Sequence, residues 1–205
     1  MADIEIRMNL DNVLGRFANQ LGHLRQKEMN KILQRGLART GNKAKTQVIR
    51  SLTRQTGLRR QVLVRAVQFR KPSYKDLTYE LKTEGGNIAL KYFRPRETGK
   101  GVSAAPQGGR RVFPSTFMRA GWWPHRVDKP GWGGHVFERT GVKTKNGKDA
   151  FRKVKSGVYI PEEMLRGETV ARWREVVNRD LEKDVEHQIG FALNIYAAYP
   201  RKPGK

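Results

Sequence analysis

Apolar residues recur at spacings of three and four along two long stretches of the chain, which is the pattern of an amphipathic helix. The first stretch begins near Glu28, and one helical face would collect its apolar and small residues Met29, Leu33, Gly36, Leu37, Thr40, Ala44, Val48 and Leu52. The second covers residues 168–196 and repeats the pattern with Val170, Trp173, Val177, Leu181, Val185, Ile189 and Leu193. We therefore predict two long helices, each with one buried face, and a bend in the first helix at Gly41.

Shorter alternating or extended apolar patterns predict strands in residues 4–8, 65–71, 76–83, 87–93, 112–118, 135–139 and 151–160. Glu84-Gly85-Gly86 predicts a hairpin turn between two of these strands. Residues 12–26 are expected to form a further helix, and residues 58–64 a short basic helix after a break at Gly57. Together these elements predict an α+β fold in which an antiparallel sheet is flanked by two long helices.

Two segments are expected to contain little packed structure. Residues 94–111 are rich in Gly, Pro and charged residues and are expected to form a flexible loop or arm, and residues 201–205 a mobile basic tail. At 205 residues the chain is long enough to bury a sizeable core. We expect a single domain over residues 1–205, with an N-terminal segment over 1–26 and these two appendages.

The charge of the chain restricts the partners that it would bind. Lys and Arg total 42 against 19 Asp and Glu, which gives a formal net charge of +23. Such a charge repels itself unless a polyanion or an acidic partner neutralises it, so nucleic acid is the first partner to consider. The sequence has no long apolar run and no signal-peptide pattern, which predicts a protein made in the cytoplasm with no membrane contact.

The basic residues concentrate on the face of the first long helix that lies opposite its apolar positions. This basic ridge consists of Lys31, Arg35, Arg39, Lys43, Arg50 and Arg54, and Arg59 and Arg60 follow the break. Because almost no acids lie among them, ion pairs within the helix cannot neutralise the ridge. We favour contact with phosphates over a merely solvated face, and expect replacement of these residues to leave folding nearly intact.

Trp122, Trp123 and Trp132 lie in a connection rich in Gly and Pro and allow two interpretations. They could stack on bases, as aromatic residues do in single-strand channels. Tryptophans in such surroundings more often anchor an irregular loop to its own body or to a neighbouring subunit. We favour anchoring and treat all three as candidate subunit-interface residues.

No catalytic, cofactor or metal site is predicted. The histidines are scattered along the chain, at His23, His125, His135 and His187, and none has ligand spacing with another. The chain has no cysteine, which excludes disulfides, thiolate metal sites and a cysteine nucleophile. A nuclease is disfavoured because no acidic cluster that would hold magnesium is visible in the sequence.

The order of motifs along residues 28–193 resembles the minor tail protein Z family of long-tailed phages, within the wider group of tail-completion and head-tail joining proteins. A basic helix comes first, and a long helix comes last. The motifs between them are, in order, Thr56-Gly57-Leu58-Arg59-Arg60, a Gly- and Arg-rich loop, Val136-Phe137-Glu138-Arg139 and Val158-Tyr159-Ile160-Pro161. The resemblance implies an α+β subunit of the virion with a structural role, without catalytic residues or a cofactor.

The resemblance also implies partners and a place in the particle. Members of the group assemble as homo-oligomeric rings, for which a hexamer is one option, at the head-proximal end of the tail. The expected neighbours are the tail tube or tail terminator, the head connector and the viral DNA end. The alternative is a cellular, sequence-non-specific nucleic-acid-binding protein, which would purify as a monomer on nucleic acid rather than as a ring on tails.

Overall fold

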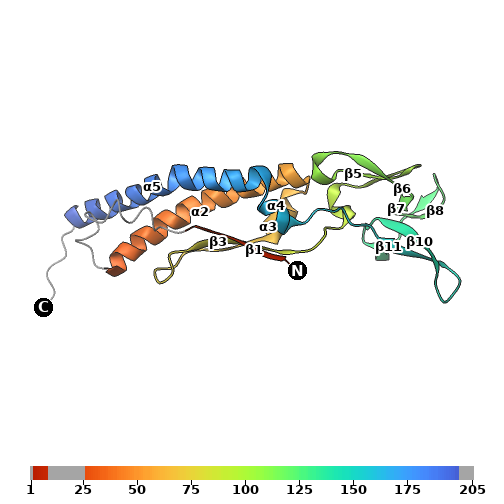
Figure 1. The fold of residues 1–205 in the computed structure, drawn as a ribbon, viewed down its shortest axis with the longest axis horizontal. Helices are drawn as coiled ribbons and strands as arrows, with labels where there is room; N and C mark the ends of the chain where they lie inside the picture. The colour runs from red at the N-terminus through yellow and green to blue at the C-terminus, as the bar shows by residue number, and fades with distance from the viewer. Residues whose placement is uncertain (1, 9–25, 199–205) are drawn as a thin grey trace. The chain divides into compact units, whose positions relative to one another are not determined.

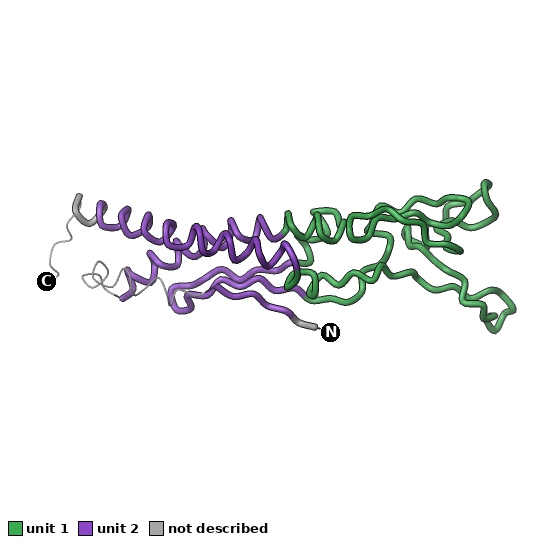
Figure 2. Tube along the Cα trace, turned by 45° about the horizontal axis from the view of Figure 1, so that its top comes forward, with its two compact units in different colours: residues 1–3, 49–66, 84–166 green, residues 4–48, 67–83, 167–205 purple. Residues whose placement is uncertain are grey.

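The structure, a computed structural model, describes residues 2–8 and 26–198 of the chain. It confirms the predicted α+β class, with antiparallel sheets and one pair of long helices (Figure 1). The chain forms two compact units (Figure 2). Unit 2 comprises residues 4–48, 67–83 and 167–205, and unit 1 comprises residues 1–3, 49–66 and 84–166. The predicted helix over 12–26 and the basic tail over 201–205 lie outside the described residues, apart from Gln26.

Unit 2 contains the pair of long helices that the sequence predicts. The first part of α2 (Gln26–Thr56) and α5 (Gly167–Ala198) run side by side in both views (Figures 1 and 2). Their apolar faces are buried, with Ile32, Leu33, Leu37, Ala44 and Val48 on α2 and Trp173, Val176, Leu181, Val185 and Ile189 on α5. Leu193, which the sequence pattern places on the buried face of α5, is 38% exposed, so the prediction is wrong at this position.

The sheet of unit 2 has the strand order β1 (Ala2–Met8), β3 (Tyr79–Gly85) and β2 (Val67–Arg70). Strands β2 and β3 are antiparallel, with Phe69 opposite Leu81. The predicted hairpin through Glu84-Gly85-Gly86 is wrong. The second neighbour of β3 is β1 from the N-terminus, and this distant strand takes the place that residues 87–93 were expected to fill.

Two glycines let α2 approach both of its neighbours closely. A Cβ at Gly36 would lie 2.8 Å from Cγ2 of Val185 on α5, and a Cβ at Gly41 would lie 2.3 Å from Cδ2 of the Tyr79 ring on β3. Five helical residues rotate a side chain by about 140°, so these glycines lie on different faces of α2. Gly41, expected to mark a bend, thus has a packing role, and the Tyr79 ring above it is fully buried.

A cluster of ion pairs joins the strands of this sheet at Glu80. Arg70 donates from Nε to Oε2 and from Nη2 to Oε1 of Glu80, each at 2.6 Å, and it also contacts Asp76. Arg7 on β1 lies 3.3 Å from the same carboxylate. The hydrogen bonds from Arg70 are the main cause that lowers the pKa of Glu80 to about 2.

We expect Glu80→Gln to remove the stability that this cluster supplies above the acid range. The folded-state pKa of about 2 lies below the ordinary value of 4.5, so the contribution is present above pH 4.5 and is lost as pH falls toward 2. Because Arg70 is largely exposed, we expect a loss of only about 1 to 2 kcal/mol at neutral pH, which disappears in acid. Urea unfolding at several pH values measures it. Glu186→Gln, at an exposed position of α5, is the control, and an equal response of both variants would contradict the assignment.

Unit 1 is rich in short antiparallel strands. Strands β4 (Arg96–Thr98), β5 (Gly101–Ala104) and β6 (Arg111–Pro114) form one sheet. A second sheet has the order β11 (Asp149–Lys153), β10 (Phe137–Lys143) and β7 (Thr116–Phe117), and β8 (Ala120–Gly121) pairs with β9 (Arg126–Val127). The strands of the described chain are thus divided among several small sheets, where the sequence suggested one.

Residues 94–111 are packed, which corrects their prediction as a flexible loop or arm. They contain β4, β5 and the 3-10 turn η2 (Pro106–Gly108), and Val102, Ala104 and Pro106 are buried. Residues 87–93, predicted as a strand, instead end in the 3-10 turn η1 (Leu90–Phe93), whose Leu90 and Phe93 are buried. In residues 94–111 the buried residues are small and lie among Gly, Pro and charged residues, so the sequence shows no strand pattern there.

The predicted breaks around the short helices are confirmed. Gly57 has a φ of +76° at the end of α2, a conformation that favours glycine, and α3 (Arg60–Ala66) follows. The predicted helical turn at Pro161 is α4 (Ile160–Met164). The strand predicted over residues 151–160 is shorter than expected, because β11 ends at Lys153.

Candidate nucleic-acid interface

The basic ridge of α2 is exposed at every predicted position, as are Arg59 and Arg60. Lys31 and Arg35 belong to unit 2, whereas Arg50 belongs to unit 1. Within the described part of the chain these three side chains have no acidic partner. Their positive charge is therefore available for a partner of opposite charge.

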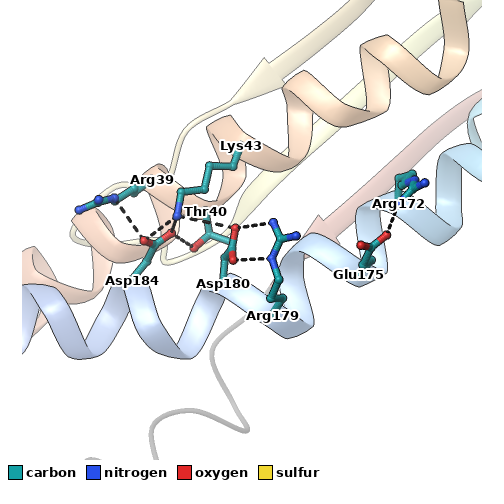
Figure 3. Close-up of polar contacts among 8 residues, drawn as sticks. All are labelled: Arg39, Thr40, Lys43, Arg172, Glu175, Arg179, Asp180 and Asp184. Carbon is teal, nitrogen blue, oxygen red and sulfur yellow. Dashed lines mark hydrogen bonds and ion pairs between the residues drawn. The ribbon is translucent and has the colours of Figure 1, made fainter.

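The middle of the ridge differs from its ends, because Arg39 and Lys43 pair with a carboxylate on α5 (Figure 3). Nζ of Lys43 donates to both oxygens of Asp184, at 2.9 and 2.8 Å. Nε of Arg39 lies 3.2 Å from Oδ1 of Asp184, and Oγ1 of Thr40 donates to Oδ2 at 2.8 Å. The expectation concerned ion pairs within α2, and these two residues are neutralised instead by an acid of another helix.

The Asp184 carboxylate makes this contact part of the helix–helix packing. Its side chain is only 6% exposed, so its charge is costly unless donors surround it. The expected near-neutral effect of replacing Arg39 or Lys43 is corrected accordingly: their loss would leave a buried carboxylate short of partners. Asp180 lies one turn earlier on α5, where the hydrogen bonds from Arg179 are the main cause that lowers its pKa.

A second concentration of positive charge surrounds a cavity in unit 1 with a volume of about 470 Å³. The cavity is lined by Arg59, Gln61, Val62, Arg65, Ala66, Lys91 and Tyr92. Of these, only Arg59 was among the predicted site residues. Arg65 could have been included because it lies in the same basic segment, whereas Lys91 and Tyr92 fall in a predicted strand and give no signal.

The tryptophans divide into one packed and two exposed side chains. The Trp132 ring lies 5.1 Å from Phe137, 5.5 Å from Phe151 and 5.8 Å from Phe117, measured between ring centroids. Trp132 thus anchors its connection to the β11-β10-β7 sheet of its own unit. Trp122 is 83% and Trp123 51% exposed, and their place in a subunit interface stays a prediction.

Residues 2–8 and 26–198 contain no candidate metal site. No three His, Cys, Asp or Glu residues of these segments are positioned to hold a metal ion. Burial is the main cause that lowers the pKa of His135, whose ring lies 6.3 Å from that of Phe137. This half-buried imidazole beside an aromatic ring has a packing role.

Compared with protein-family models, with curated proteins and with solved structures, the chain matches none of them. None of the described helices is both long and apolar enough to span a membrane. The features that indicate a function are the exposed basic side chains and the order of motifs along the chain.

Proposed function

We propose that the chain is a structural subunit at the head-proximal end of a phage tail, where it contacts DNA through phosphate groups. The subunit forms a homo-oligomeric ring between the tail tube or terminator and the head connector. In this role the protein holds or guides the DNA end and performs no catalysis. The place in the tail rests on the resemblance of the motif order to minor tail protein Z.

The observation that carries the DNA contact is the set of exposed basic side chains that have no acidic partner among the described residues, represented by Lys31 and Arg35 on α2. Surface cations usually lie among acids that offset them, but these side chains follow one another along a helix face. The phosphate backbone of a nucleic acid is the polyanion that such a row of cations would bind. Contacts with phosphates carry no sequence information. Binding without sequence preference is what a protein that holds any DNA end requires.

The first test compares two double variants of α2 that remove the same charge. Lys31→Gln with Arg35→Gln removes two cations that have no acidic partner in residues 2–8 and 26–198, so we expect unchanged stability and weaker binding to duplex DNA. The slope of log affinity against log salt should fall in magnitude by about 0.9 for each phosphate that the variant no longer binds. Fluorescence anisotropy across a salt series measures both quantities.

The matched control is Arg39→Gln with Lys43→Gln, which changes the same charge further along the same helix. Here the Asp184 carboxylate loses its cationic partners, and we expect the free energy of unfolding to fall by about 2 to 3 kcal/mol. The loss should be smaller than for a fully buried ion pair, because both cations are half-exposed. If the Lys31/Arg35 variant kept the parent affinity and salt slope, this face would not contact DNA.

The second test locates the protein. Purified phage particles should contain a few copies each, and labelling by electron microscopy should place them where the tail meets the head. Recovery of the protein only as a monomer on cellular nucleic acid, and never on tails, would reject the tail assignment in favour of a cellular nucleic-acid-binding protein.

A further inference from the structure

The basic cavity of unit 1 is formed by two short elements that meet side by side. Arg59 and Arg65 approach it from α3 and the residue before it, whereas Lys91 and Tyr92 come from η1. All of these elements belong to unit 1. The cavity is therefore a feature of one compact unit.

The charge of the lining selects an anionic ligand. Arg59, Arg65 and Lys91 contribute positive charge, and the lining includes no Asp or Glu. Among the described residues neither arginine has an acidic partner, so their guanidinium donors are available. A concave site lined by one sign of charge concentrates the field, and guanidinium groups suit phosphate oxygens in particular.

The aromatic member of the lining indicates more than a free phosphate. Tyr92 lines the cavity and is 40% exposed, and Nζ of Lys91 lies 5.2 Å from the centroid of its ring. Val62 adds an apolar surface, and a volume of about 470 Å³ falls in the range of small-ligand sites. An exposed ring beside cations is the arrangement on which a nucleic-acid base stacks while its phosphate is neutralised.

We propose that this cavity binds one nucleotide of a single-stranded nucleic acid, with its base on Tyr92 and its phosphate at Arg59, Arg65 and Lys91. The proposal rests on the proposed function in assuming that the chain meets nucleic acid. A single strand is required because a base within a duplex is already covered by its neighbours on both faces. The cavity thus separates single-strand binding from the duplex contact assigned to Lys31 and Arg35.

The test measures anisotropy of a labelled oligothymidine and of a duplex of the same length on the full chain. Tyr92→Ala should weaken oligothymidine binding about thirtyfold, the middle of the range for one stacked base, and leave duplex binding unchanged. Tyr92→Phe keeps the ring and should bind as the parent does. Arg59→Gln with Arg65→Gln should weaken oligothymidine binding and reduce the salt slope by about 0.7 for each phosphate that the variant no longer binds.

The charge-matched control is Lys145→Gln with Lys148→Gln, two exposed lysines in the turn between β10 and β11. This variant removes the same charge from unit 1, at positions that do not line the cavity. It should change oligothymidine affinity less than about twofold, since long-range charge effects are screened by salt. An unchanged affinity of Tyr92→Ala, an equal loss for duplex and single strand, or no binding of oligothymidine by the parent would each overturn the proposal. The duplex contact would still be judged separately by the Lys31/Arg35 variant, so the two failures are distinguishable.

Discussion

Gly41→Ala is expected to lower the free energy of unfolding by about 3 kcal/mol, although alanine is the better helix former. The added Cβ would lie 2.3 to 2.5 Å from three carbons of the Tyr79 ring, far inside van der Waals contact. The ring cannot turn away cheaply, because it is fully buried and its hydroxyl lies 3.3 Å from Oδ1 of Asn42. Helix α2 or strand β3 must therefore shift, and urea unfolding measures the cost.

Gly190→Ala provides the control for the intrinsic effect of the substitution. Gly190 lies in α5, is exposed, and has nothing within 4 Å of the position that a Cβ would take. Alanine there should raise the free energy of unfolding by up to about 1 kcal/mol through helix propensity alone. Opposite signs at the two positions would establish the close contact of α2 with β3. A stabilising effect at both positions would show that Gly41 does not pack on the Tyr79 ring.

The two long helices could be predicted from the sequence because burial on one face of a helix produces a period that a single chain displays. Leu33, Leu37, Trp173 and Ile189 all follow it and are all buried. The same period cannot identify what each face contacts. Gly36 stands out in the sequence only as a small residue, because its partner Val185 is distant along the chain and gives no signal.

The strand-rich unit was predicted less well because its strands are short and its core residues are small or isolated. Val102 and Ala104 are buried in β5 within a segment dominated by glycine and charge. Two or three apolar residues do not make a countable alternation, whereas Gly and Pro strongly predict loops. The η1 turn was predicted as a strand for a related reason: Leu90 and Phe93 are both buried at a spacing that short patterns cannot assign.

The exposed basic face of α2 was predicted in outline, since the balance of charges can be counted directly along the chain. The pairing of Arg39 and Lys43 could not be predicted from α2, because Asp184 lies on another helix and is surrounded there by charges of both signs. The cavity at Arg59 and Tyr92 depends on two turns meeting in space. Charge can thus be predicted from composition, but its neutralisation depends on tertiary contacts.

Trp173→Ala is expected to cost about 3 to 5 kcal/mol, the range for removing a large aromatic side chain from a core. Trp173 is 5% exposed on α5 and belongs to the buried face of that helix. Because native proteins are in general only marginally stable, a loss of this size should shift the urea midpoint strongly while the m-value stays close to that of the parent.

Two leucines on the same helix test whether the buried face ends where the structure places its end. Leu181 is 6% exposed and Leu193 is 38% exposed, although the sequence pattern treats them alike. We therefore expect Leu181→Ala to cost about 2 to 5 kcal/mol and Leu193→Ala less than about 1 kcal/mol. Equal costs at the two positions would mean that the apolar face continues to Leu193 and is covered there.

A Trp173→Ala variant as stable as the parent would show that the apolar face of α5 does not hold this helix in place. The contacts of Asp184 would then be what holds α5 against α2.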